Sequence, residues 1–223
     1  MPDNAVDEAR RREILGLAKD TFHLASGILT SYTDLLSAGA DRVIKIGELS
    51  ISFHEKIMLL DGGAIVLSLS LIGALLPHAP HLAAHKSFLW LVCPAWLLLL
   101  YSIYCCWQRM AATQVMNLHL VTAMSSECAG LHIQQLRIMT ARLRGRLTPE
   151  ELTRVDGSSE PSADPVKQLE ELCKHFDSQK LENMEKALKA DERGILFARQ
   201  VFWTTFAAFF LLCAFAVRAI LTY

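Results

Sequence analysis

The stretch Phe53 to Leu76, FHEKIMLLDGGAIVLSLSLIGALL, sets what this chain can fold into. From Ile57 onward it carries a single charge, Asp61. About 20 residues of such apolarity match a hydrocarbon layer ~30 Å thick when they form an α-helix. The sequence therefore predicts a membrane span over residues 57–76, and the chain is expected to be an integral membrane protein.

Two further stretches have the same character. SFLWLVCPAWLLLLYSIYCC predicts a second span over residues 87–106, and VFWTTFAAFFLLCAFAVRAIL predicts a third over 201–221. Residues 77–86 contain two prolines, which end a helix, and so predict a short outer loop. The chain is 52% hydrophobic and 20% charged, which is unusual for a soluble domain but only mildly apolar for a chain wholly inside a bilayer. A sizeable part should therefore lie outside the membrane.

Residues 8–56, after a flexible tail at 1–7, predict one amphipathic helix that continues into the first span. Apolar or small side chains recur every seven residues, with partners three residues later. They are Leu15, Phe22, Leu29, Leu36, Val43 and Ile57, with Ser50 as the polar interruption, and Ala18, Ala25, Tyr32, Gly39, Ile46 and Phe53. Ile28, Leu35 and Leu49 widen this stripe beyond that of a two-stranded coiled coil. The helix should pack in a bundle of three or more.

Two more helices are predicted outside the membrane. Residues 107–146 hold one formal charge between positions 111 and 136, Glu127, which is typical of an inner helix or of a face where copies meet. Residues 147–165 are rich in Pro, Gly and Ser and predict a linker. Residues 166–200 predict a charged outer helix that leads into the third span. At 1.5 Å per residue the three helices are roughly 55–70 Å long, so they can form one helical rod.

Lysine and arginine flank the spans on one side, whereas the outer loop holds only Lys86. By the positive-inside rule this predicts an inner or plasma membrane protein with a cytoplasmic rod and amino terminus, and an outward carboxyl terminus.

Asp61 is the leading candidate site residue, because a charge about one helical turn inside a membrane is costly. With His54 and Ser68 it shares one helical face, so rings of Asp61 in a homo-oligomer could line a cation path. Glu55 is a further candidate contact at the membrane entrance.

The competing interpretation is structural. Asp61 then caps a neighbouring helix, or pairs with Arg109 or Arg199 near the cytoplasmic interface. His54 and Glu55 would then mark a helix end whose charges stay among the lipid headgroups.

Other candidates have simpler explanations. Arg218 is an interface or gating candidate near the outer end of the third span, where a long side chain can snorkel to the interface. His78, His81 and His85 in the outer loop have spacings that suit zinc or acid sensing. No carboxylate or cysteine shares that loop, so a solvated loop is preferred. The six cysteines show no zinc-site spacing, and no cofactor is expected.

Several function classes have no support in the sequence. It contains no GxSxG, no HExxH and no phosphate-binding glycine loop, so an enzyme is not expected. A membrane-interface enzyme that uses His54, Glu55 and Asp61 is a third hypothesis. The formal net charge is −1 and no nucleic-acid-binding motif is present, so nucleic acid is not an expected partner.

The layout of residues 8–146, a long helix, a tight pair of spans and a helix that returns to the cytoplasm, resembles that of SLATT-type two-span effectors of bacterial antiviral systems. The third span departs from that layout. The resemblance implies an oligomeric pore that damages the membrane when triggered.

Two main functions are therefore predicted. The first is an oligomeric channel or pore-forming effector. The second is a non-conducting scaffold or signalling subunit whose rod binds a cytoplasmic protein. The surroundings of Asp61 distinguish them, because a pore needs it on a wetted axis and a scaffold allows it to be paired.

Overall fold

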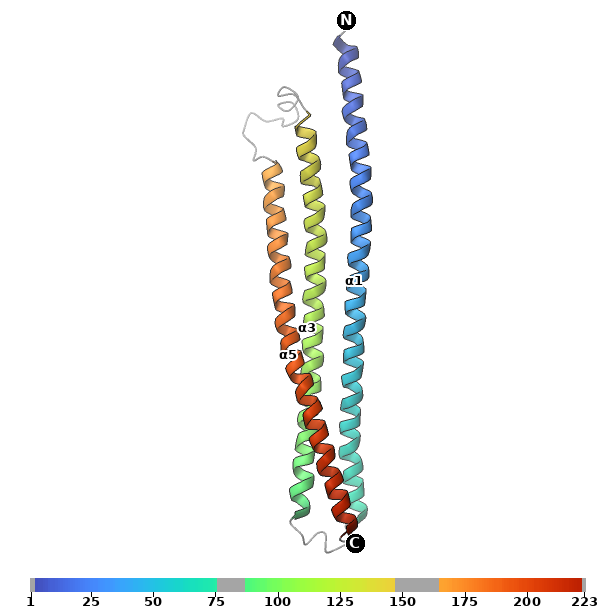
Figure 1. The fold of residues 1–223 in the computed structure, drawn as a ribbon, viewed down its shortest axis with the longest axis vertical. Coiled ribbons are helices and arrows are strands. Elements are labelled where there is room, and N and C mark those ends of the chain that lie inside the picture. Colours follow the sequence, from blue (N-terminus) through green and yellow to red (C-terminus); the bar gives the residue numbers. More distant parts are fainter. Residues whose placement is uncertain (1–2, 76–86, 147–164, 222–223) are drawn as a thin grey trace. The chain divides into compact units, whose positions relative to one another are not determined.

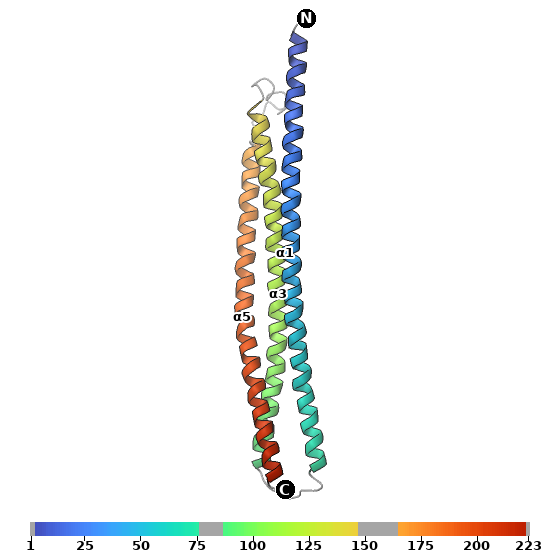
Figure 2. The same ribbon diagram turned by 45° about the vertical axis from the view of Figure 1, so that its right-hand side comes forward.

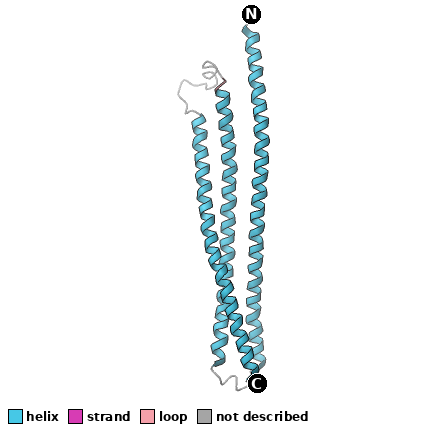
Figure 3. Cartoon of the chain, in the orientation of Figure 1, coloured by secondary structure: helices cyan, strands magenta, loops and turns pink. Residues whose placement is uncertain are grey.

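The computed structural model describes residues 3–75, 87–146 and 165–221. These residues form three long helices, α1 (Asp3–Leu75), α3 (Ser87–Arg144) and α5 (Pro165–Leu221). Figure 3 shows helix throughout the described part apart from a short turn after α3. The predicted all-α class is confirmed. The outer loop with His78, His81 and His85, and the linker up to residue 164, lie outside the described residues.

Each helix contains a stretch that is long and apolar enough to cross a membrane, judged by length and composition. One such stretch lies in each of the three helices in which the sequence predicts a span. α1 begins at Asp3, five residues before the expected start at residue 8, and continues without interruption into the first candidate span. α3 likewise continues past Pro94. Apolar periodicity over such lengths favours helix because it gives each helix a face to bury.

The helices divide into two compact units along their length. The first unit comprises residues 1–42 and 119–185. Within it α1 and α5 run opposite to α3, and α3 and α5 lie side by side in both views (Figures 1 and 2). α1 approaches α3 closely, since a Cβ at Gly39 would lie 3.1 Å from Cε of Met124. In this unit α1 thus packs beside α3, but Leu15, Phe22, Ile28 and Leu35 of the predicted apolar stripe are 59 to 72% exposed.

The second unit comprises residues 43–118 and 186–223 and contains the candidate spans. Its interior is built from small and medium side chains. Val92, Ala95, Leu99, Cys105, Cys106, Val201, Ala208 and Phe215 are at most 4% exposed. Small residues let membrane helices approach closely, so dispersion contacts can hold them together. The buried apolar residues belong to α3 and α5 and include two clusters, Val92 with Phe215, and Cys105 and Cys106 with Val201, against which partly buried residues of α1 pack. Several buried polar side chains lie in the same unit.

Candidate functional site

Asp61 belongs to a polar node with one residue from each helix of the second unit, Asp61 of α1, Ser102 of α3 and Thr205 of α5. Asp61 and Ser102 are both 0% exposed. Oγ1 of Thr205 donates a hydrogen bond to Oδ2 of Asp61 at 3.3 Å, and lies 2.7 Å from Oγ of Ser102. We call these three residues the Asp61 node. It joins all three candidate spans through hydrogen bonds in an apolar interior.

The partners of Asp61 are hydroxyl groups, with no arginine among them. Arg109 instead pairs with Asp191, with Nη1 and Oδ1 3.4 Å apart, and Arg199 is exposed. Oδ1 of Asp61 has no hydrogen-bond partner among the described residues. The buried Cys106 thiol also interacts with Ser102 and Asp61, so a sulfur atom lies beside these oxygen atoms.

His54 and Ser68, which the sequence predicts to share the helical face of Asp61, are likewise buried, at 6% and 9% exposure. Each has its own partner, however. Nδ1 of His54 lies 2.7 Å from the Ser50 carbonyl oxygen, and Oγ of Ser68 accepts from Nε1 of Trp96 at 2.8 Å. Glu55 is exposed and lies outside this buried face.

The outer surface of the candidate spans has the opposite character. Large apolar side chains are 55 to 76% exposed there, namely Leu59, Leu60, Val66, Leu67, Leu97, Leu100, Phe206 and Phe210. The exposed Ser70 donates to the carbonyl oxygen of Val66 in its own helix. Arg218 is exposed in the last turn of α5. Over the described candidate spans, therefore, Asp61, Ser68 and Ser102 are buried, whereas the outer surface consists mainly of large apolar side chains.

A partly buried ion pair, which was not predicted from the sequence, lies beside the spans. The Arg109 side chain is 14% exposed, pairs with Asp191, and leaves its Nε without a partner among the described residues. A Cβ at Gly194 would collide with the Arg109 guanidinium, whose Cζ would be 3.0 Å away. Gly194 therefore provides the space for the Arg109 guanidinium. In the sequence, the signal for this pair was the presence of opposite charges near the ends of two predicted spans.

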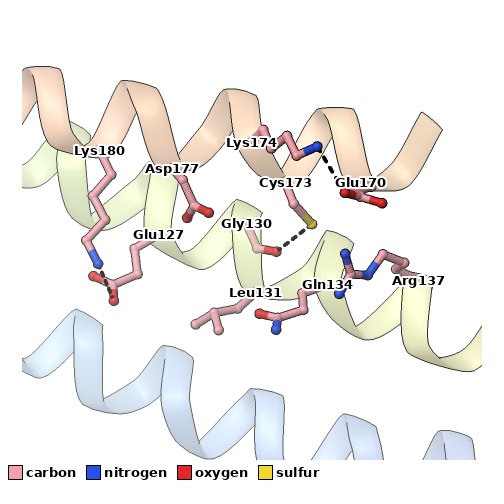
Figure 4. A pocket seen from close by; sticks show the side chains of 10 residues that line it. All are labelled: Glu127, Gly130, Leu131, Gln134, Arg137, Glu170, Cys173, Lys174, Asp177 and Lys180. Carbon is pink, nitrogen blue, oxygen red and sulfur yellow. Dashed lines mark hydrogen bonds and ion pairs between the residues drawn. The ribbon is translucent and has the colours of Figure 1, made fainter. Parts of the chain in front are cut away.

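The first unit has a polar node of its own, centred on Glu127 of α3. Nζ of Lys180 in α5 lies 2.8 Å from Oε1 of Glu127 (Figure 4). The Tyr32 hydroxyl of α1 donates to the same oxygen at 3.3 Å. Glu127, Lys180 and Tyr32, the Glu127 node, thus join the three helices here. In the sequence, Glu127 is recognisable as a candidate because it is the one charged residue in an otherwise uncharged stretch.

A cavity of about 260 Å³ opens between α3 and α5 next to this node (Figure 4). Its charged lining residues are Glu127, Glu170 and Asp177, and Arg137, Lys174 and Lys180. Glu170 and Lys174 form an ion pair at 2.9 Å, and this bond lowers the pKa of the Glu170 carboxyl. Burial, followed by the charge of Glu127, raises the pKa of the neighbouring Cys128 thiol. With three groups of each sign, the cavity does not select a ligand by charge.

The described residues contain no group of three or more His, Cys, Asp or Glu side chains placed to hold a metal ion. In comparisons with protein-family models, with curated proteins and with solved structures, no match to the chain was found.

Proposed function

We propose that this chain is a non-conducting membrane adaptor, anchored by three spans, whose helices outside the membrane hold a partner protein. The observation that carries the proposal is a set of exposed large apolar side chains on α1 of the first unit. Leu15, Phe22, Ile28 and Leu35 are 59 to 72% exposed there, outside the candidate spans. Several large apolar side chains that are exposed to water near one another mark a protein-binding surface.

The Asp61 node supports the non-conducting part of the proposal. An ion path needs polar groups on a wetted surface, as in rings of carboxylates around a pore. Asp61 is instead enclosed by helices of its own chain and bound by Thr205. The outward surface of the described spans is apolar, which suits contact with lipid or with another apolar helix.

The adaptor would be oriented by its basic residues, with the first unit and the amino terminus in the cytoplasm. α1 then presents these exposed apolar side chains, which are spaced seven, six and seven residues apart, to cytoplasmic proteins along one helix.

Site-specific photo-crosslinking in native membranes tests the partner. A photoreactive amino acid at Leu35, which is 72% exposed, should form adducts with a second protein. The matched control is Asp34, an exposed neighbour that points about 100° away round the helix. Equal labelling at both positions, or adducts of the chain with itself alone, would contradict the adaptor.

Ion flux through proteoliposomes tests the alternative channel. We expect the parent protein to conduct no more than empty liposomes do. Conductance by the parent that falls in Asp61→Asn would replace the adaptor with a pore in which Asp61 contacts the ion.

A further inference from the structure

A second apolar face runs along α1 within the second unit. Its members are Ile46, Leu49, Phe53, Leu60 and Leu67, which are 66, 71, 59, 57 and 72% exposed. The spacings of three, four, seven and seven residues place them all in the two core positions of one heptad repeat. We call these five residues the α1 seam.

The seam is distinct from the face that α1 buries inside its own bundle. Buried residues directly follow four of the seam residues along the chain. The pairs are Ile46 and Gly47, Phe53 and His54, Leu60 and Asp61, and Leu67 and Ser68. Successive residues of an α-helix lie about 100° apart round its axis. The seam therefore lies along the flank of the buried face and is left uncovered by α3 and α5.

We propose that the α1 seam packs against the same seam of a second copy of this chain, with the two α1 helices parallel. The seam passes from Phe53, outside the predicted span, to Leu60 inside it. Its occupant must then be a helix that enters the bilayer at the same depth. A second copy meets this condition by symmetry, because a twofold axis along the membrane normal brings equal positions together.

The extent of the seam suits a dimer. A buried Leu or Ile side chain contributes on the order of 100 Å². Five such residues bury roughly 500 Å² per copy, which with their neighbours approaches the ~800 Å² per partner of a standard interface. The part in water supplies the hydrophobic gain, since Ile46, Leu49 and Phe53 are all more than half exposed.

Within the span the second copy has a place to dock. Leu60, Gly63 and Leu67 line an open apolar groove of about 460 Å³, with Phe209 and Ala216 of α5 on its other side. A Cβ at Gly63 would meet no atom of the described residues within 4 Å, so a neighbouring helix can approach its backbone. The charged residue in this register is Lys56, whose ammonium group can reach the headgroups while its stem covers apolar surface.

Disulfide crosslinking of the full chain in membranes tests the seam. α1 has no native cysteine, so the parent for the test needs only the exposed Cys93 and Cys213 replaced by alanine. Leu49→Cys and Phe53→Cys should each give a covalent dimer on mild oxidation, because equal positions face each other. Glu48→Cys, which is exposed on another face, is the matched control and should crosslink far more slowly.

A second measurement does not depend on a new thiol. Leu49→Ser should raise the dimer dissociation constant at least about tenfold in detergent, by light scattering, whereas Glu48→Gln should leave it unchanged. Crosslinking at Leu49 no faster than at Glu48, or a crosslink to a different protein, would overturn the proposal. The seam dimer does not depend on the adaptor, because photo-crosslinking at Leu35 detects a different protein and disulfide formation at Leu49 detects a second copy.

Discussion

At the scale of single residues, the hydrogen bonds of Asp61 decide what it can do. A carboxyl group inside a membrane needs polar partners, and Thr205 supplies one from another helix. The hydroxyls of Ser102 and Thr205 are in turn close to each other. The node therefore links α1 to α5 and α3 to α5, and Asp61 stabilises the pairing of the candidate spans.

Thr205→Val should lower the free energy of unfolding by about 0.5–1.5 kcal/mol, because it removes the hydroxyl that donates to Asp61 and keeps the side-chain shape. The matched control is Thr204→Val, whose hydroxyl bonds to carbonyl oxygens of its own helix, and which should change the free energy by less. Unfolding in detergent measures both. Equal effects would show that the bond to Asp61 has no stabilising role.

The sequence identifies Asp61 as the residue of interest but does not identify its partners. A single charged residue within an apolar stretch can be recognised from the sequence of one helix alone. Which hydroxyl meets it depends on the rotation and axial shift of two other helices. For the same reason the sequence suggested Arg109 as a partner, whereas the space left at Gly194 lets Arg109 reach Asp191.

At the scale of whole elements, the periodicity of α1 predicted one long helix with a broad apolar stripe. The seam is exposed, and the adjoining buried positions hold Gly47, His54, Asp61 and Ser68. The sequence could not assign the buried face, because these four residues are not the large apolar side chains that mark an interior. In α3 the low charge density predicted an inner helix, and the bonds to Glu127 from α1 and α5 agree with that position.

A double-mutant cycle on Glu127→Gln and Lys180→Met should give a coupling free energy of about 1 kcal/mol in unfolding measurements, because both side chains are partly shielded from water. The control cycle uses Glu170→Gln and Lys174→Met, an exposed pair within one helix, and should give a clearly smaller coupling. Equal couplings would show that the Glu127 node adds nothing to the pairing of α3 and α5.

At the scale of the whole molecule, the described residues hold three candidate spans. We propose that all three cross the bilayer, which would place the two ends of the described chain on opposite sides. By the positive-inside rule, the proposed orientation has the amino-terminal end in the cytoplasm.

Accessibility of tags in sealed vesicles tests this topology. A protease-sensitive tag before α1 should be cleaved when the cytoplasmic face is outward, and a tag after α5 should be protected. The reverse vesicle orientation should reverse both results. Cleavage of both tags from one side would mean that one candidate span does not cross.

Gly47 and Gly194 have a consequence for the evolution of this chain. A Cβ at Gly47 would meet the Asn117 side chain, with its Cγ 2.9 Å away, just as one at Gly194 would meet Arg109. In both cases a polar side chain of α3 occupies the volume that a methyl group on another helix would need. In homologous sequences we therefore expect each glycine to be replaced together with its polar partner. Positions 47 and 117 should covary, and so should positions 109 and 194.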